Sequence, residues 1–382
     1  MRALAAVDRE YAPTETALDV RDRDLAYICT QARDAFLQLA GKRLLITGGA
    51  GFLGYYLVQA ALHWNATEGS SNPIFVTVYD NYVRGVPAWL ADLKGNRHLD
   101  LVRHDIRGPM PDGAGPFEYV VHAAGIASPI YYRRYPIQTM DANINGLRTL
   151  LAHSLDHAEA TSLQGFLFFS SSEIYGDPTP ENIPTPETYR GNVSCTGPRA
   201  CYDESKRYGE TLCVNFAGQY GLPVKIARPF NNYGPGLKIT DGRALPDLCR
   251  DVLHHRDVVL HSDGSPTRTF CYSADAVSGY IKALVHGDAG EAYNIGVERP
   301  EIAMRDLATM IVDTARDLFG YRGKVVHRPH QDADYLVDNP NRRCPVIDKA
   351  RSHLGYSPQV SLADGIRRSL IWYRDNLVAA EA

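Results

Sequence analysis

Apolar residues along this chain alternate between short continuous runs and longer stretches in which they recur every three or four positions. The runs are typical of strands buried in a parallel sheet, and the periodic stretches are typical of helices that pack against it. The runs predict strands at 43–47, 74–79, 100–106, 119–125, 166–170 and 224–228. Helices are predicted to begin near 52, 141 and 202. These repeated strand–helix units predict an α/β fold, a doubly wound parallel (Rossmann) sheet.

The 382 residues suffice for one large domain or two coupled ones. Residues 1–23 are polar and predict an irregular arm, and a helical pattern runs from Asp24 to Leu39, so we assign 1–41 to an arm and helix. Glycine and proline become frequent after Pro229. We therefore assign 42–230, rejoined by about 270–293, to the sheet domain, and 231–269 with 294–382 to a smaller C-terminal substrate-binding domain.

Composition excludes several classes of protein. A net charge of -4 does not suit a protein that binds nucleic acid. No run of ~20 apolar residues exists, so no membrane span is expected, and the first residues lack the apolar segment of a signal peptide. Seven scattered cysteines without a Cys-x-x-Cys pair predict reduced thiols and a cytoplasmic location. The 13 histidines show no metal-ligand spacing, so we expect no metal site.

The segment after the first predicted strand is rich in glycine. It leads directly into a helix, and strand–glycine turn–helix is the context that makes this motif specific for a dinucleotide. The glycines let the backbone turn tightly and bring the amides of the helix N-terminus to a pyrophosphate. We assign to this contact Gly48, Gly51, Phe52, Leu53 and Gly54.

A carboxylate follows the second predicted strand. Asp80 stands where it can accept hydrogen bonds from the adenosine ribose and repel a 2′-phosphate, so we expect NAD rather than NADP. The nearby cation Arg84 works against this preference. We expect Asp105 to meet the adenine, and small residues after the strand at 119–125 to allow close approach. The further cofactor-binding residues are therefore Asn81, Asp105, Ile106, Ala123 and Ala124.

A tyrosine and a lysine stand four positions apart at the start of the helix predicted from 202. Tyr202 and Lys206 therefore lie on one helix face. A free tyrosine has a pKa of about 10, and bringing it near neutral requires about 4 kcal/mol of preference for the phenolate. An ammonium at about 4 Å supplies roughly that amount at an effective dielectric constant of ~20. We therefore expect Lys206 to let Tyr202 take a proton from a substrate hydroxyl while hydride leaves the same carbon.

Longer stretches match a known family. On these residues, over about 42–375, the chain resembles the extended short-chain dehydrogenases that act on nucleotide sugars, and among them most of all the UDP-glucuronate decarboxylases. It differs at Gly236, His261 and Val346, where that family usually has arginine, tyrosine and aspartate. The matching stretches are 171–178, 186–193, 197–206 (Gly197-Pro198-Arg199-Ala200-Cys201-Tyr202-Asp203-Glu204-Ser205-Lys206), 241–243, 267–272 and 343–345.

The resemblance implies a set of roles. NAD would be bound tightly and recycled, and two copies of the chain would form a homodimer through the helices near 141–155 and 202–219. Tyr202 would be the catalytic base and Lys206 its partner, with Ser172 and Glu173 facing the sugar. The implied substrate-binding residues for the nucleotide sugar are Tyr132, Ser172, Glu173, Asn231, Arg243, Arg268 and Arg343.

The residues beside the sugar favour one reaction within this family. All of these enzymes first oxidise C4 of the sugar. A 4,6-dehydratase then needs an acid to expel the C6 hydroxyl, and Ser172 cannot serve as that acid. A 4-epimerase usually has small residues where this chain has Glu173. A glucuronic acid oxidised at C4 is a β-keto acid and loses carbon dioxide without a strong acid, so we expect conversion of UDP-glucuronate to UDP-xylose.

Three alternatives stay open at this stage. They are a 4-epimerase or a 4,6-dehydratase on the same fold, and a non-catalytic NAD-sensing protein. Proteins of the last kind typically lack the tyrosine or the lysine, whereas Tyr202 and Lys206 are both present here. The nucleobase of the substrate is not decided by these residues.

Overall fold

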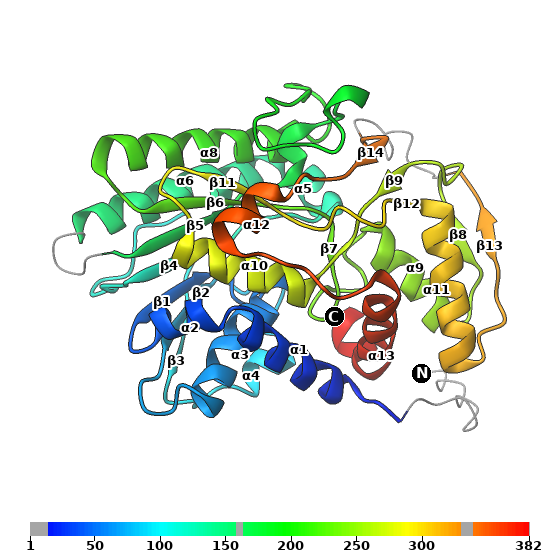
Figure 1. The fold of residues 1–382 in the computed structure, drawn as a ribbon, viewed down its shortest axis with the longest axis horizontal. Coiled ribbons are helices and arrows are strands. Elements are labelled where there is room, and N and C mark those ends of the chain that lie inside the picture. Colours follow the sequence, from blue (N-terminus) through cyan, green and yellow to red (C-terminus); the bar gives the residue numbers. More distant parts are fainter. Residues whose placement is uncertain (1–13, 158–162, 330–338, 382) are drawn as a thin grey trace.

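The computed structural model describes residues 14–157, 163–329 and 339–381. Within them, seven parallel strands form the central sheet in the order β3–β2–β1–β4–β5–β6–β11 (Figure 1). The predicted doubly wound parallel sheet is confirmed. The strands are Arg43–Thr47 (β1), Phe75–Asp80 (β2), Leu99–Arg103 (β3), Tyr119–His122 (β4), Gly165–Phe169 (β5), Val224–Pro229 (β6) and Ala292–Ile295 (β11).

Some strand ends differ from the prediction. The strand predicted at 100–106 ends at Arg103, which pairs with Asp80, the last residue of β2. The strand predicted at 119–125 ends at His122, opposite the end of β1. Beyond these points the neighbouring strand has ended, so the backbone leaves the sheet. The edge strand β11 was not predicted, and the predicted domain boundary between 293 and 294 falls inside it.

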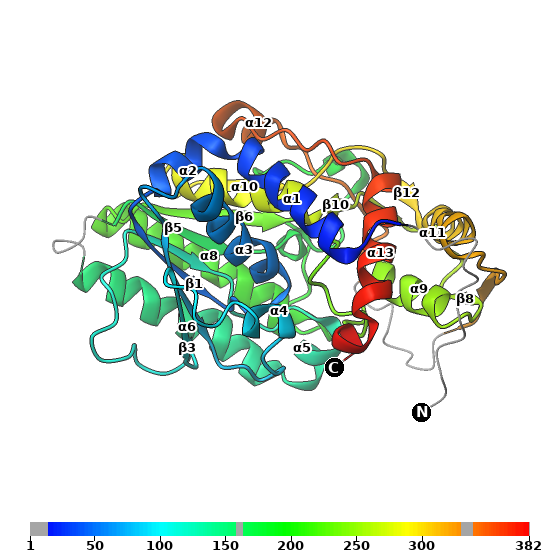
Figure 2. The same ribbon diagram turned by 90° about the horizontal axis from the view of Figure 1, so that it is seen from below.

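Helices cover both faces of the sheet (Figures 1 and 2). On one face lie α6 (Pro136–Asp156) and α8 (Ala200–Tyr220), and on the other lie α3 (Phe52–Thr67) and α10 (Ser273–His286). Successive residues of a strand point to opposite faces. Leu45 therefore joins the core under α6, whereas Leu44 and Ile46 join the core on the side of α3.

The start of the chain adds a third layer outside α3 and α10. It consists of α1 (Ala17–Gln31) and α2 (Arg33–Leu39), which pack against those two helices. The prediction of an irregular arm over 1–23 was wrong for 17–23. Thr16 and Asp19 form a reciprocal cap that starts α1 seven residues earlier than Asp24, and Val20 is buried. Residues 1–13 of the predicted arm lie outside the described residues.

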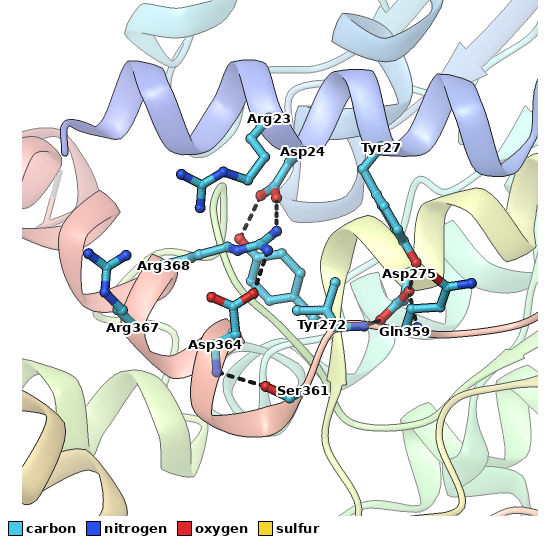
Figure 3. A network of polar contacts seen from close by, with 12 residues as sticks. Arg23, Asp24, Tyr27, Tyr272, Asp275, Gln359, Ser361, Asp364, Arg367 and Arg368 are labelled. Carbon is cyan, nitrogen blue, oxygen red and sulfur yellow. Dashed lines mark hydrogen bonds and ion pairs between the residues drawn. The ribbon is translucent and has the colours of Figure 1, made fainter.

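A buried polar network fastens α1 to the C-terminal helix α13 (Leu362–Glu381), as Figure 3 shows. The Asp24 carboxylate is fully buried and accepts hydrogen bonds from the hydroxyls of Tyr56 and Tyr272. It also accepts from Arg368 of α13, with Oδ1 2.7 Å from Nη1. A buried carboxylate is costly unless it is paired, and here every partner comes from a different element. The segment from Ala17 to Leu39 is therefore an integral layer of the fold.

The smaller domain lies beside the carboxyl end of the sheet (Figure 1). A parallel pair of short strands and a three-stranded sheet lie beside its helices. Residues 330–338 of the predicted substrate-binding domain lie outside the described residues. Its elements are α9 (Ala244–Leu253), β8 (Val258–Leu260), β9 (Thr267–Arg268), β12 (Ile302–Ala303), α11 (Met304–Phe319), β13 (Val325–His327), β14 (Arg342–Arg343) and α13.

Within the described ranges, no helix is long and apolar enough to cross a membrane.

Short elements connect the sheet, its covering helices and the smaller domain. The connecting elements are α4 (Ala88–Ala91), α5 (Pro129–Arg134), η1 (Ser172–Tyr175), η2 (Pro180–Asn182), β7 (Asn232–Tyr233), β10 (Cys271–Tyr272) and α12 (Asp348–Leu354).

Candidate active site

A cavity of about 1670 Å³ follows the carboxyl ends of the sheet strands and continues into the smaller domain. Open α/β sheets bind ligands at this edge, next to the strand where the order reverses, which here is β1. Every residue that we assigned to a site from the sequence lines the cavity. The lining includes the glycine turn, Tyr202 and Glu173 beside the sheet, and Arg243 with residues of α9 in the smaller domain.

The glycine turn fits a pyrophosphate. A Cβ on Gly48 would lie 2.7 Å from the backbone of Ala124, and one on Gly54 would lie 2.1 Å from the carbonyl oxygen of Gly49. Both positions therefore exclude any side chain. Gly51 is the N-cap of α3, and no side chain caps the first turn of that helix. The first amides of α3 are thus left to an anion in the cavity, such as the pyrophosphate of a dinucleotide.

Asp80 fastens this turn to the end of β2. One carboxylate oxygen accepts from the Ala50 amide at 3.0 Å, and the other accepts from the Tyr82 amide at 2.8 Å. Burial raises the pKa of Asp80. Arg84, the cation that would favour a 2′-phosphate, pairs instead with Asp241 in the smaller domain, at 3.5 Å. The surroundings of Asp80 thus keep the character expected for NAD.

Asn81 and Asp105 lie side by side at the edge of the same end. Asn81 Nδ2 donates to Asp105 Oδ2 at 3.3 Å, and Asp105 also accepts from the Arg107 side chain at 2.7 and 2.9 Å. The Arg107 hydrogen bonds are the main cause that lowers the pKa of Asp105. Ile106 is buried against Gly146 of α6. Asp105 is therefore an ionised acceptor at the mouth of the dinucleotide end.

Tyr202 and Lys206 lie on the buried face of α8, as their spacing predicted. The Lys206 ammonium lies 5.8 Å from the centre of the Tyr202 ring and donates to the Phe169 carbonyl at 2.7 Å. Burial lowers the pKa of Lys206 to about 7. The Tyr202 ring stacks on Tyr132, with 5.1 Å between the ring centres. The phenol is thus held between a cation and a second aromatic ring.

The expected depression of the Tyr202 pKa is not found in this structure. Burial raises the pKa of Tyr202 to about 12, against a hydrogen bond with Ser171 and the charge of Arg243, which both lower it. Lys206 is not among the main groups that lower the Tyr202 pKa, and burial weakens the charge of Lys206 itself by lowering the pKa of its ammonium to about 7. The phenol therefore needs additional positive charge nearby before it can act as a base at neutral pH.

Glu173 is held between two arginines that are distant in the chain. Arg199, at the start of α8, and Arg343, in β14, both donate to its carboxylate, with Arg343 Nη2 at 2.7 Å. Burial raises the pKa of Glu173, but the charges of the two arginines outweigh burial and hold the pKa at about 2. Glu173 is consequently an ionised carboxylate. Ser172, beside it, is buried at the cavity wall.

Arg199 is a site residue that our sequence reasoning missed. It lines the cavity and is 6% exposed. The available signal was its position three residues before Tyr202, a spacing that places two side chains on one face of a helix. Its link to Glu173 and Arg343 was not visible, because these residues come from three separate segments.

The other predicted substrate residues lie around the same region. Arg268 is buried in β9 and donates to backbone carbonyls, including Thr267 at 2.7 Å and Asn341 at 3.1 Å. Asn231 donates to the Thr269 carbonyl at 2.8 Å. Arg243 pairs with Asp241, with 3.0 Å between Nε and Oδ1. Arg268 is thus partly committed to holding its own strand, whereas Arg243 keeps donors for a ligand in the cavity.

Gly236 explains one departure from the family pattern. Its φ is +87°, and an added Cβ would lie 2.4 Å from the Cβ of Tyr55. Both the backbone conformation and the neighbouring ring exclude an arginine at this position.

No group of three or more His, Cys, Asp or Glu side chains within the described ranges could hold a metal ion.

Comparisons with known proteins agree with this geometry. A family model described as "NAD dependent epimerase/dehydratase family" matches residues 44–296. Among curated proteins, UDP-glucuronic acid decarboxylase 3 of Arabidopsis thaliana is 35% identical over 324 residues, which cover 85% of this chain and 86% of that protein. UDP-glucuronic acid decarboxylase 1 of Xenopus tropicalis is 33% identical over 336 residues, which cover 88% and 73%.

Solved structures with the same fold include two nucleotide-sugar enzymes. The UDP-glucose 4-epimerase of Thermotoga maritima superposes with a TM-score of 0.73 at 26% identity, covering 88% of this chain and 99% of that one. A dTDP-glucose 4,6-dehydratase of Streptomyces venezuelae, solved with NAD bound, gives 0.73 at 27% identity, covering 87% and 97%. With its glycine turn, Asp80 and the Tyr202–Lys206 pair along one cavity, the chain belongs to the NAD-dependent epimerase/dehydratase family.

Proposed function

We propose that this protein is an NAD-dependent nucleotide-sugar decarboxylase that converts UDP-glucuronate to UDP-xylose through a 4-keto sugar. The observation that carries the proposal is the residue pair Ser172-Glu173, in which Glu173 is an ionised carboxylate between Arg199 and Arg343. A dehydratase needs a protonated carboxyl there, and this site offers none. The curated relatives named as UDP-glucuronic acid decarboxylases support the same choice.

Oxidation at C4 comes first. NAD held by the glycine turn and Asp80 would supply an acceptor for the C4 hydride and a positively charged ring in the cavity. Tyr202 takes the proton of the C4 hydroxyl on its phenol oxygen, which Ser171 orients by a hydrogen bond. The Tyr132 ring, stacked on Tyr202, keeps water away from one face of the phenol. This chain therefore supplies the base and its orientation.

Loss of carbon dioxide needs no strong acid. The C5–C6 bond breaks, carbon dioxide leaves, and the electron pair moves to the C4 ketone as an enolate. C5 then takes a proton and hydride returns to C4. The wall near Glu173 carries the guanidinium groups of Arg199, Arg268 and Arg343, and the carboxylates near them are Glu173, Asp203, Asp177 and Glu301. A guanidinium group can bind a carboxylate through two parallel hydrogen bonds, so these arginines suit a substrate that carries a carboxylate.

Heavy water distinguishes the possible reactions. With UDP-glucuronate as substrate, we expect a pentose nucleotide with one deuterium at C5 and none at C4, because C4 recovers its original hydrogen as hydride. Mass spectrometry and NMR of the product provide the measurement. A 4-epimerase would give an isomer of unchanged mass without label. A 4,6-dehydratase given a nucleotide hexose would lose water and take up label at C5. No reaction with any uronic acid nucleotide would refute the proposal.

The identity of the bound nucleotide tests Asp80. We expect NAD, not NADP, to be released when the purified protein is denatured. Asp80→Asn replaces one carboxylate oxygen by an amide nitrogen, which is not an acceptor. The variant therefore loses one of the two hydrogen bonds that Asp80 accepts, from the Ala50 amide or from the Tyr82 amide. We therefore expect ~10-fold weaker NAD binding from this variant, measured by titration. Recovery of mainly NADP from the wild-type protein would contradict the role given to Asp80.

We also propose a cytoplasmic homodimer. Its support is an apolar surface on the paired helices α6 and α8, where Ile137 is 62% exposed, Tyr208 48% and Val214 47%. Large apolar side chains gathered on two adjacent helices suit contact with a second copy. The seven cysteines are free thiols, which supports a reducing compartment.

A further inference from the structure

The loop that follows β2 meets the smaller domain across the cavity. This loop, residues 81–87, carries Arg84, whose Nη1 lies 3.5 Å from Asp241 Oδ2. The Arg84 guanidinium also lies over the Tyr131 ring of α5, 4.9 Å from its centre. The carbonyl of Arg84 accepts from the Lys238 ammonium at 3.2 Å. One residue of the dinucleotide side therefore contacts both the smaller domain and α5.

Asp241 also forms an ion pair with Arg243 and so links Arg84 to Arg243. The Asp241 side chain is only 5% exposed, and its second oxygen lies 3.0 Å from Arg243 Nε. Its backbone carbonyl accepts from the Ser128 hydroxyl at 2.7 Å. Arg243 in turn donates to the Ala127 carbonyl at 3.3 Å. The Asp241 carboxylate thus lies between two guanidinium groups, one from each side of the cavity.

Apolar packing holds only the start of this loop, where Tyr82 packs against the core. Val83 is 80% exposed and Val86 is 51% exposed. A Cβ added to Gly85 would meet no atom within 4 Å. The Arg84 side chain is itself 38% exposed, so it does not form part of the core. Its polar contacts instead link the loop to the opposite wall of the cavity.

We propose that Arg84 is a positioning residue that straps the 81–87 loop over the dinucleotide and, through Asp241, orients Arg243 toward the diphosphate of the nucleotide sugar. The part that concerns Arg243 rests on the proposed function, whereas the part that concerns the loop requires only a bound dinucleotide. Because the residues assigned to both ligands line one cavity, the same contact would retain NAD during turnover and prepare the substrate site.

Two measurements on the holoprotein test the strap. In Arg84→Ala, we expect bound NAD to exchange with an excess of labelled NAD about tenfold faster, since an ion pair and a cation–π contact are lost. The KM for UDP-glucuronate should rise by about the same factor, with kcat changed less than twofold. Arg97→Ala is the matched control, because Arg97 is an exposed arginine that does not line the cavity. It should behave as wild type in both measurements.

Further variants separate the strap from a general loss of charge. Arg84→Lys keeps the charge but not the planar group that stacks on Tyr131, so NAD exchange should stay several-fold faster than in wild type. Tyr131→Leu removes the ring from the opposite side and should accelerate NAD exchange in the same direction. Unchanged NAD exchange in Arg84→Ala and Tyr131→Leu would overturn the strap. Faster exchange with an unchanged KM would overturn the link to Arg243.

The test does not depend on the reaction. NAD exchange is measured without substrate, so it can succeed even if the wild-type protein yields no pentose nucleotide from UDP-glucuronate. That second result would refute the proposed function alone. Conversely, a wild-type protein that decarboxylates UDP-glucuronate while Arg84→Ala exchanges NAD normally would refute the strap alone.

Discussion

Tyr202→Phe is expected to lower the turnover of UDP-glucuronate by ~100-fold or more, the range usual for loss of a general acid–base group. The substitution removes only the phenol oxygen, which accepts the proton of the C4 hydroxyl in the proposed reaction. The ring that stacks on Tyr132 at 5.1 Å is kept, so folding and NAD binding should survive. Steady-state kinetics, thermal unfolding and the content of bound NAD provide the three measurements.

Tyr208→Phe is the matched control for this variant. Tyr208 lies on the same helix, α8, but is 48% exposed, so its hydroxyl has no place in the cavity. Its turnover should stay within twofold of the wild type. A folded Tyr202→Phe protein that retains near wild-type turnover would remove Tyr202 from the mechanism and would leave the family assignment unaffected.

Glu173→Gln is expected to lose both activity and stability. The carboxylate neutralises Arg199 and Arg343, whose side chains are 8% and 5% exposed. Removing one partner of a buried ion pair leaves uncompensated charge and costs about 3 kcal/mol, the lower end of the usual range, because Glu173 is itself 20% exposed. Urea unfolding at pH 7 measures this loss. Turnover should fall as well, while NAD stays bound.

The dependence of this loss on pH has a definite sign. The pKa of Glu173 is held at about 2, below its ordinary value of 4.5. Its contribution to stability is therefore complete above the ordinary pKa and is lost as the pH falls from 4.5 toward about 2. The difference in unfolding free energy between wild type and Glu173→Gln should shrink over that range. A pH-independent difference would contradict the ion-paired carboxylate.

A Glu→Gln substitution at a surface glutamate is the control for the effect of replacing a carboxylate by an amide. Glu181 lies in the exposed turn η2, and Glu181→Gln should leave the free energy of unfolding within about 0.5 kcal/mol of the wild type. If Glu173→Gln were as stable as this control at pH 7, the two arginines would have found other partners. The arrangement of arginines that is proposed to receive the uronate carboxylate would then lose its main support.

Features that depend on neighbours in the sequence were predictable from the residues. The continuous apolar runs predicted parallel strands that are buried on both faces, as Leu44, Leu45 and Ile46 illustrate. Gly48 and Gly54 are required where a strand turns into a helix with no room for a Cβ. Tyr202 and Lys206 share a face because a helix turns every 3.6 residues. Each of these conclusions needs only local geometry, which the order of residue types determines.

Contacts between distant segments were not predictable in this way. Arg199, Glu173 and Arg343 form one cluster although up to 170 positions separate them, and Arg343 belongs to β14, which pairs with β9 of the smaller domain. The direction in which the Tyr202 pKa shifts also depended on burial, on the hydrogen bond with Ser171 and on the charge of Arg243. Burial and charge are properties of a three-dimensional environment, so a pattern of spacings along the chain does not contain them.

The segment that forms α1 shows the same difference between local pattern and distant contacts. Its helical pattern was readable from Asp24 onward, but the role of Asp24 as a buried acceptor for Tyr56, Tyr272 and Arg368 was not. Likewise, Arg84 was read as a neighbour of Asp80 in the sequence, whereas its side chain reaches Asp241 in the smaller domain. Residue types predicted which element each side chain belongs to. Its partners depended on tertiary packing, because a long polar side chain pairs with whatever charge the fold brings within its reach.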